Sequence, residues 1–356
     1  MDGISIIGSG DSAGCIYFRD SLDGLPALVR GHGPVFLIYD NNVSSFASSI
    51  LSSAEVVSSF GVDVSEDAKT LATVEGICSW LLESGADRNA VLVAVGGGIL
   101  TDMAGFAAAV YKRGIKAVYV PTTLLAQVDA SVGGKTGVNF RGFKNILGVV
   151  RQPLFTYICP RVLETLPYGH ILEGAAEMIK TFVIKDGGNY RKAVSLFSSL
   201  AESGGDSDAV RKSIPDLEGL VRAAVEVKAE IVSEDQFEGG VRRKLNLGHT
   251  FAHAIEWCSH SISHGQAVSM GIVLAARLSE KLSLCRPGLA QMIACDLERC
   301  GLAVVSPFPV ARLHDAMLKD KKSENGKIYF VLIRDTGDTE VVPLSAEMVI
   351  KLLETE

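Results

Sequence analysis

Histidines are concentrated in one short stretch of the chain. Four of the seven histidines fall within sixteen residues: His249, His253, His260 and His264. His249 and His253 are four positions apart, so they share one face if the segment is helical. Two imidazoles at this spacing, joined by one carboxylate, are typical of a zinc site with an open coordination position. Spacing alone favours His249 and His253 as the ligands, and the carboxylate stays open among three candidates: Glu177, Glu238 and Glu256.

Glycine-rich stretches suggest where a nucleotide phosphate could bind. Gly96, Gly97 and Gly98 follow an apolar run and precede a helix-like segment. Consecutive glycines let the backbone approach a phosphate closely, and a helix N-terminus offers free N–H groups. The motif Gly8-Ser9-Gly10-Asp11-Ser12-Ala13 also fits a dinucleotide pattern, but no acid-ended strand follows about 20 residues later, so we interpret it as a plain turn.

Lysines next to glycines form a second candidate anion site. Lys135 follows Gly133 and Gly134 in a string similar to the end of a P-loop, but Asp129 stands where that motif requires glycine, which excludes the P-loop. Lys144 and Asn145 follow soon after. Cationic and amide side chains beside exposed backbone amides predict an oxyanion or phosphate pocket.

The first 150 residues alternate short apolar runs with helix-like segments. The runs at 35–39, 91–95 and 117–120 each end at turn residues or small polar residues. Continuous apolar runs of this length predict buried parallel strands in an open α/β sheet. Ligands bind such sheets at the carboxyl ends of the strands, where Asp40 and the glycines fall.

The pattern changes to helical spacing from about residue 163. Residues 175–184 and 220–231 have helical apolar periodicity, and 201–208 predicts an exposed loop. Late in the chain, 328–333 and 340–342 predict a small hairpin. The expected organisation is therefore a Rossmann-like α/β domain over 1–160 and a mainly helical domain over 161–356.

Composition limits the possible partners and compartments. A chain of 356 residues has room for roughly two domains, and its net charge of −7 does not suggest a nucleic-acid partner. No apolar run approaches the ~20 residues that span a membrane, and the N-terminus lacks a signal-peptide pattern. Seven cysteines without a CxxC pair favour reduced thiols. These features predict a soluble cytoplasmic protein.

Several strings together resemble the 3-dehydroquinate synthase family of sugar phosphate cyclases. They occur in the family's order and cover about residues 35–322: GGGILTDMAGFAAAVYKRGI, VPTTLLAQVDASVGGKTGVN, KNILG, EGAAEMIK, EGGVRRKLNLGHTFAHAIE, HGQAV and DKK. The resemblance implies an NAD-binding α/β domain, a helical metal-binding domain and a homodimer. The chain departs from the family at Gln266, where glutamate is common, and at 167–174, which we expect to be an atypical loop.

Carried over residue by residue, the resemblance implies a site for each ligand. The zinc (or cobalt) ligands would be Glu177, His249 and His264, so His253 becomes a substrate-contacting or proton-relaying residue. The substrate pocket and catalytic set would comprise Asp129, Lys135, Lys144, Asn145, Lys180, Lys228, Glu238, Arg242, Asn246, His253 and Lys321. Arg113 would reach the substrate phosphate, either within its own subunit or from the neighbouring subunit of the dimer. The NAD set would be Asp40, Asn42, Glu66, Lys69, Gly97, Gly98, Asp102, Thr122, Thr123, Lys135, Lys144 and Thr165.

The reaction implied by the resemblance converts 3-deoxy-D-arabino-heptulosonate 7-phosphate to 3-dehydroquinate and phosphate. It combines transient oxidation by NAD, phosphate β-elimination, re-reduction and an intramolecular aldol closure. The alternatives are another cyclase of the same family, a metal-dependent NAD polyol dehydrogenase and a catalytically silent NAD-binding protein. Three side chains suited to a substrate carboxylate favour the dehydroquinate reaction: Lys228, Arg242 and Asn246.

Overall fold

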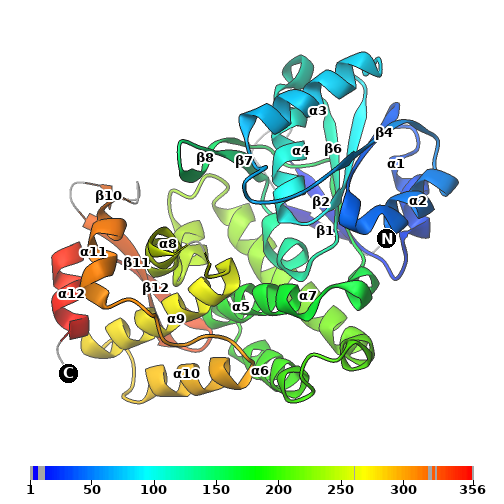
Figure 1. Cartoon of the computed structure of the whole chain (residues 1–356). Coiled ribbons are helices and arrows are strands. Elements are labelled where there is room, and N and C mark those ends of the chain that lie inside the picture. The colour runs from blue at the N-terminus through cyan, green and yellow to red at the C-terminus, as the bar shows by residue number, and fades with distance from the viewer. Residues whose placement is uncertain (1–2, 7–12, 260, 320–322, 325–326, 355–356) are drawn as a thin grey trace. The chain divides into compact units, whose positions relative to one another are not determined.

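The computed structural model describes residues 3–6, 13–259, 261–319, 323–324 and 327–354 (Figure 1). Three features singled out in the sequence lie outside this part: the glycine motif over 8–12, His260 and Lys321. The chain divides into two compact units, one of Met1–Leu166 with Lys228–Phe237 and the other of Pro167–Val227 with Glu238–Glu356.

The first unit is built on a seven-stranded sheet within the described residues. In spatial order its strands are β1 (Gly3–Ile6), β2 (Gly14–Phe18), β9 (Phe155–Ile158), β6 (Lys116–Pro121), β5 (Val91–Gly96), β3 (Val35–Asp40) and β4 (Val56–Val62). All neighbours are parallel except β1 and β2. The predicted strands at 35–39, 91–95 and 117–120 are confirmed as parts of β3, β5 and β6. These runs are apolar because both sheet faces are covered.

Helices cover both faces of this sheet (Figure 1). On one face, Phe36 and Ile38 pack with residues of α3 (Leu71–Glu83) and α4 (Gly98–Val110). On the other face, Leu37 packs with residues of α1 (Leu25–Val29) and α2 (Ser44–Ser53). Successive side chains of a strand point to opposite faces, so one apolar run serves two cores.

The strand order reverses beside β3. From β3 the chain runs outward to β4 and then crosses back to β5 on the other side of β3. The carboxyl ends of β3 and β5 are paired neighbours, with Tyr39 opposite Val95. Asp40 and the three glycines therefore lie at the topological switch point, where open α/β sheets bind ligands.

A hairpin and a short helical segment follow β6 in the same unit. The hairpin consists of β7 (Lys135–Phe140) and β8 (Phe143–Val150), and β7 packs against α4. A short π-helical segment, Ala126–Ala130, precedes it. Lys135 thus begins a strand, although the sequence indicated a glycine-rich turn there, and Asn145 lies within the second strand.

The second unit is mainly helical, as the sequence predicts. Its helices are α5 (Tyr168–Lys185), α6 (Gly187–Glu202), most of α7 (Ser207–Glu234), α8 (His249–Cys258), α9 (His264–Lys281), α10 (Leu289–Arg299), α11 (Val310–Lys319) and α12 (Ala346–Glu354). Its small sheet contains β10 (Ser323–Glu324), β11 (Lys327–Asp335) and β12 (Asp338–Leu344). Strands β11 and β12 confirm the predicted hairpin.

Two predicted loops need correction. The segment 167–174 is not a loop, because α5 begins at Tyr168 and buries Ile171 and Gly174. Burial of this face outweighs the low helix propensity of its glycines. The predicted loop at 201–208 is shorter, since α6 continues to Glu202 and α7 begins at Ser207.

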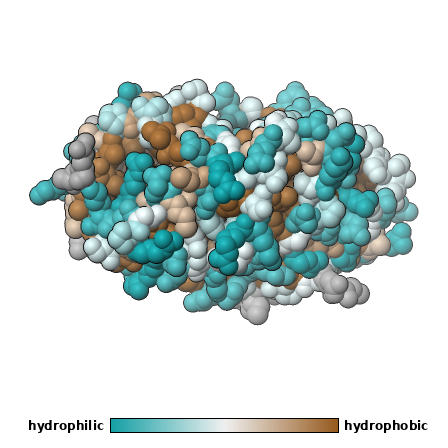
Figure 2. Space-filling model, turned by 90° about the horizontal axis from the view of Figure 1, so that it is seen from below, coloured by the Kyte–Doolittle hydropathy of each residue, from teal (hydrophilic) through white to brown (hydrophobic). Residues whose placement is uncertain are grey.

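The surface is predominantly hydrophilic on the face shown in Figure 2, where hydrophobic residues form separate patches. Within the described ranges, no helix combines the length and apolar character needed to cross a membrane.

Candidate functional site

Three side chains from three helices of the second unit form a candidate metal site. Glu177 lies on α5, His249 is the first residue of α8 and His264 is the first residue of α9. Their ligand atoms all lie within 4.8 Å of one another. Glu177 Oε1 is 3.0 Å from His264 Nε2 and 3.6 Å from His249 Nε2. Two atoms bound about 2.0–2.1 Å from a tetrahedral ion lie roughly 3.3 Å apart, so the three residues fit one metal ion.

Glycines allow the three helices to approach closely. Gly248 precedes α8 in the left-handed region at φ 76°, and a Cβ on Gly271 of α9 would lie 2.1 Å from the Gly248 carbonyl oxygen. A Cβ on Gly265 would lie 2.5 Å from Cα of Glu173, one turn before Glu177. Only glycine fits at these contacts, which explains the Gly that follows His264 in the sequence motif.

Hydrogen bonds orient both imidazoles. Nδ1 of His249 is 3.2 Å from the Leu247 carbonyl oxygen, and Nδ1 of His264 is 3.3 Å from Glu256 Oε1. A carbonyl or carboxylate oxygen only accepts, so each Nδ1 carries the hydrogen that it donates. Each Nε2 is thereby directed at Glu177, and a metal ion bound there would displace the hydrogen that Nε2 of His264 donates to this carboxylate.

Electrostatics in this site favour an ionised Glu177 carboxylate. Burial alone would raise the pKa of Glu177, but Lys180, His249 and His264 hold it well below its usual range. Nζ of Lys180 is 2.5 Å from Glu177 Oε2, and both side chains are buried. Burial and Lys180 hold the pKa of His249 low, which keeps it in the neutral form that ligates metals. Burial opposes protonation of His264, but Glu177 and Glu256 outweigh it and raise the pKa of His264 to about 10.

The structure separates the three carboxylates that the sequence left open. Glu177 joins the two histidines, Glu256 lies on the far side of His264, and Glu238 accepts a hydrogen bond from Nδ2 of Asn246. The structure also does not confirm His249 and His253 as the pair of histidine ligands. The ring of His253 is 5.6 Å from that of His249, but His264, not His253, completes the group among the described residues.

Several proposed NAD residues of the first unit lie just after the ends of β3, β5 and β6. Oδ1 of Asp40 accepts hydrogen bonds from the backbone N and the Nδ2 of Asn42, at 2.9 and 3.0 Å. A Cβ on Gly97 would lie 3.1 Å from Thr123 Cγ2, and one on Gly98 would lie 2.9 Å from Ala130 Cβ. These glycines let the backbone at the start of α4 pack closely against its neighbours, and the N-terminus of this helix offers N–H groups suited to an anion. Thr122 is buried beside them, and Thr165 donates a 3.4 Å hydrogen bond to the Val162 carbonyl.

Two buried lysines contact three further predicted residues of this unit. Nζ of Lys69 lies 2.5 Å from Asp102 Oδ2 and 2.6 Å from Asn145 Oδ1. Burial raises the pKa of Asp102, and the nearby Lys69 opposes this shift. Nζ of Lys228 lies 2.5 Å from Asp129 Oδ1 and 2.7 Å from the Asp129 carbonyl oxygen. The contacts thus link a predicted substrate residue, Asn145, to two predicted NAD residues.

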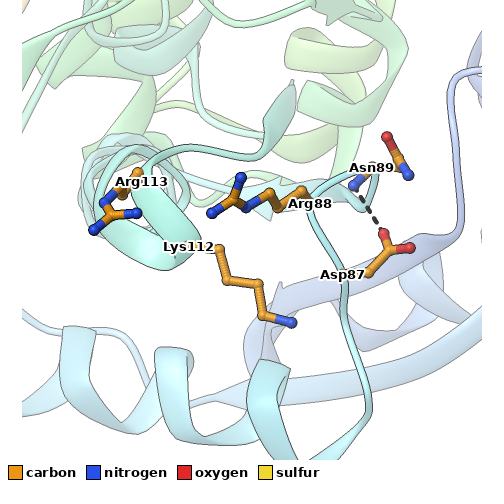
Figure 3. A pocket seen from close by; sticks show the side chains of 5 residues that line it. All are labelled: Asp87, Arg88, Asn89, Lys112 and Arg113. Atoms are coloured by element: carbon orange, nitrogen blue, oxygen red, sulfur yellow. Dashed lines mark hydrogen bonds between the residues drawn. The ribbon is translucent and has the colours of Figure 1, made fainter.

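Arg113 lines a pocket that neither Lys69 nor Lys228 lines. It lines a pocket of about 550 Å³ with Asp87, Arg88, Asn89 and Lys112 (Figure 3). Lys112 and Arg113 both adopt left-handed backbone conformations, at φ 48° and 67°. Among the described residues that line the pocket, Arg113 alone belongs to the predicted substrate set.

Sequence reasoning missed two residues that hold the site in place. Glu256 entered only as a possible ligand, and the structure instead places it against Nδ1 of His264. Asn139 was not selected at all, yet it contacts Glu66 and Asn145. An i+7 spacing from His249 on an amphipathic helix could have marked Glu256 as a neighbour of the site, whereas no local signal marks Asn139.

Comparison with known proteins places the chain in a family. The family domains described as "3-dehydroquinate synthase N-terminal" and "3-dehydroquinate synthase C-terminal" match residues 59–173 and 174–323. The 3-dehydroquinate synthase of Acidithiobacillus ferrooxidans is 39% identical over 331 residues, which cover 90% of this chain and 88% of that protein. The 3-dehydroquinate synthase of Halorhodospira halophila is 44% identical over 283 residues, covering 78% and 76%.

Solved structures agree on the fold. A 2-deoxy-scyllo-inosose synthase, complexed with carbaglucose-6-phosphate, NAD+ and Co2+, has a TM-score of 0.84 at 23% identity and covers 99% of each chain. The 2-epi-5-epi-valiolone synthase of Streptomyces hygroscopicus, with NAD+ and Zn2+ bound, has a TM-score of 0.84 at 27% identity and covers 96% and 95%. The chain matches both family domains and is 39–44% identical to the synthases of Acidithiobacillus ferrooxidans and Halorhodospira halophila. It therefore belongs to the 3-dehydroquinate synthase family.

Proposed function

We propose that this protein is a 3-dehydroquinate synthase, which converts 3-deoxy-D-arabino-heptulosonate 7-phosphate to 3-dehydroquinate and phosphate. The observation that carries the proposal is the group of Glu177, His249 and His264, whose ligand atoms converge within 4.8 Å. It occurs in a chain whose curated relatives bear this name.

The proposed cofactors are NAD and a zinc ion, with cobalt as an alternative metal. A bound zinc ion would supply Lewis acidity toward substrate hydroxyls, and bound NAD would accept a hydride and return it. Glu177, His249 and His264 would hold the metal. The proposed NAD residues are Asp40, Asn42, Glu66, Lys69, Gly97, Gly98, Asp102, Thr122, Thr123, Lys135, Lys144 and Thr165. The position of Asp40, Gly97 and Gly98 at the switch point of the sheet supports this assignment.

The cations of the site suit an anionic substrate. Lys180, Lys228 and Arg242 are buried, and attraction to a substrate carboxylate or phosphate is stronger in a buried site than in bulk water. Asp129 holds Lys228 in one orientation through two contacts. With Lys135, Lys144 and Asn145 these groups would fix both ends of the substrate, while Asn246, Glu238 and His253 would contact its hydroxyls.

Positioning is the main task proposed for these side chains. The phosphate group of the substrate can serve as the base for its own elimination, so no strong general base is required at the adjacent carbon. Holding the reacting groups in place can supply roughly 7–11 kcal/mol in favourable intramolecular cases. Arg242, Lys228 and Asn246 suit a carboxylate, which favours the heptulosonate over sugar phosphates that lack one.

The proposal also includes the setting in which the protein works. We take it to be a cytoplasmic homodimer with no nucleic-acid or membrane partner. Residues 1–160 would bind NAD, residues 161–356 would bind zinc and substrate, and Arg113 would reach the phosphate in the assembled dimer.

Phosphate release is the direct test. The purified protein would be assayed with heptulosonate phosphate, with and without NAD, after chelation and after zinc is restored. We expect release only when both NAD and metal are present, and none from glucose 6-phosphate or a heptulose phosphate. Release from one of those two substrates alone would identify another cyclase. NADH formation from a polyol without phosphate release would identify a dehydrogenase.

A further inference from the structure

Asn139 stands at the centre of a hydrogen-bond network in the first unit. Its backbone N donates to the Lys69 carbonyl oxygen at 2.9 Å. Its Oδ1 accepts from the backbone N of Asn145 at 2.9 Å, and its Nδ2 donates to Glu66 Oε1 at 2.8 Å. One side chain therefore touches two segments that are far apart in the sequence, with 73 positions between Asn139 and Glu66.

The chemistry of the partners fixes the orientation of the Asn139 amide. A carboxylate accepts only, so the Nδ2 end must face Glu66. A backbone N–H donates only, so the Oδ1 end must face Asn145. The flipped amide would place like groups against each other at both ends, so the side chain has one favourable arrangement.

An irregularity in the hairpin frees Asn139 for this role. The pairing of β7 with β8 shifts register between Val138 and Phe140, so Asn139 lies at a bulge. Its N–H leaves the hairpin ladder and bonds to Lys69 instead. Bulges redirect a side chain out of the regular pleat and are frequent beside binding sites.

The contact with Asn145 supports a strained backbone. Asn145 adopts φ 50°, a left-handed conformation that costs energy outside glycine but is tolerated best by asparagine. In this conformation its Oδ1 accepts from Nζ of Lys69 at 2.6 Å, and Lys69 also contacts Asp102. The bond from Asn139 thus stabilises the backbone that presents Asn145 to Lys69.

We propose that Asn139 is a positioning residue that couples the NAD site to the substrate site. The inference rests on the proposed function, which assigns Glu66 and Lys69 to NAD and Asn145 to the substrate. Asn139 need not touch either ligand itself. It holds the Glu66–Lys69 segment and the β8 backbone at Asn145 in one mutual arrangement, so that its loss affects both binding steps.

Two substitutions separate the two ends of the amide. Asn139→Ala removes both side-chain contacts, so we expect faster hydrogen exchange at the Asn145 amide. We also expect the NAD dissociation constant to rise about tenfold, which is the lower end of the range for losing a hydrogen bond to a charged group. Asn139→Asp keeps an oxygen for Asn145 but sets a second carboxylate against Glu66. We expect it to retain slow exchange at Asn145 and still weaken NAD. In both variants kcat/KM for the heptulosonate phosphate should fall.

Asn189→Ala is the matched control. Asn189 also has a side-chain bond to a carboxylate, with Nδ2 2.7 Å from Asp186 Oδ2, but it lies on α6 of the second unit. We expect a similar change in stability with an unchanged NAD dissociation constant. The NAD dissociation constant would be measured by calorimetry on folded, zinc-loaded protein, alongside unfolding curves.

The outcomes distinguish this inference from the proposed function. If the wild type binds NAD and Asn139→Ala changes neither its dissociation constant nor exchange at Asn145, the positioning role is contradicted. If Asn189→Ala weakens NAD equally, the effect is general destabilisation and the role is also contradicted. A wild type that binds no NAD would overturn the proposed function itself.

Discussion

At the scale of single residues, the candidate metal site depends on which nitrogen of each histidine carries hydrogen. The Leu247 carbonyl and the Glu256 carboxylate each engage an Nδ1, and this directs the two Nε2 atoms at Glu177. The three-dimensional positions of these groups select the ligand set, because spacing along the helix alone favoured His249 with His253. Substitutions can therefore separate ligands from neighbours.

The first prediction concerns the ligands themselves. Glu177→Ala, His249→Ala and His264→Ala should each lose bound zinc, because each removes one of three donor atoms. His253→Ala should keep its zinc and lose rate. Metal analysis of dialysed, folded protein measures this. Zinc retained in His264→Ala and lost in His253→Ala would restore the ligand pair that spacing alone favours.

The second prediction concerns Glu256, which is 8% exposed and faces Nδ1 of His264. Its removal in Glu256→Ala should weaken zinc binding about 10- to 100-fold, the usual range for residues that orient a ligand. Glu256→Gln keeps an oxygen acceptor and should lose less. A competition titration with a chromophoric chelator reports the affinity. Equal affinity in Glu256→Ala and wild type would show that the contact does not orient the imidazole.

At the scale of elements, α4 is held close to its neighbours by glycine. A Cβ on Gly105 would lie 2.2 Å from Tyr119 Oη and 2.4 Å from Thr136 Cγ2. Both neighbours are buried, so they have little room to move. The fit of this helix, which begins at the proposed phosphate loop, is therefore set by one small residue.

The third prediction follows from that fit. Gly105→Ala should lower the free energy of unfolding by about 1–3 kcal/mol through overpacking. Gly76→Ala is the control, because a Cβ on Gly76 of α3 meets no atom within 4 Å. It should raise the free energy of unfolding by up to about 1 kcal/mol through helix propensity. Denaturant unfolding compares them, and a neutral Gly105→Ala would contradict the packing argument.

The sequence predicts those elements whose signal is local. Apolar runs identified β3, β5 and β6, and an apolar pattern around a turn identified the hairpin of β11 and β12. The prediction of a loop at the start of α5 was wrong. The glycines there indicate a loop, but the burial of Ile171 stabilises a helix. Strand β4 was missed because its serines interrupt the apolar run.

The site is less predictable because its contacts are long-range. Spacing identified the histidine stretch but could not choose among Glu177, Glu238 and Glu256, since 87 positions separate Glu177 from His264. The resemblance named the group that the structure brings together. Asn139 was beyond both approaches, because its role depends on a bulge and on partners from another segment.

At the scale of the whole molecule, each unit contains a buried cysteine whose reactivity depends on whether that unit is folded. Cys159 lies in the first unit and Cys300 in the second. Burial raises the pKa of both thiols, that of Cys300 to about 11. Both are therefore poor nucleophiles near neutral pH as long as their unit stays folded.

The fourth prediction is a pattern of thiol labelling. At pH 8 an alkylating reagent should modify the exposed Cys295 quickly and leave Cys159 and Cys300 unmodified. In denaturant all three should react. Mass spectrometry of a timed series measures the rates. Native labelling of Cys300 as fast as that of Cys295 would contradict the packing of the second unit.

The fifth prediction tests the central claim, that NAD takes part in a cycle and is not consumed. The measurement follows phosphate release and NADH absorbance together while the zinc-loaded protein turns over heptulosonate phosphate with a trace of NAD. We expect phosphate in large excess over the NAD supplied, with no net accumulation of NADH, because the hydride is returned in each turnover. NADH that accumulates one for one with product would contradict the account and identify a polyol dehydrogenase.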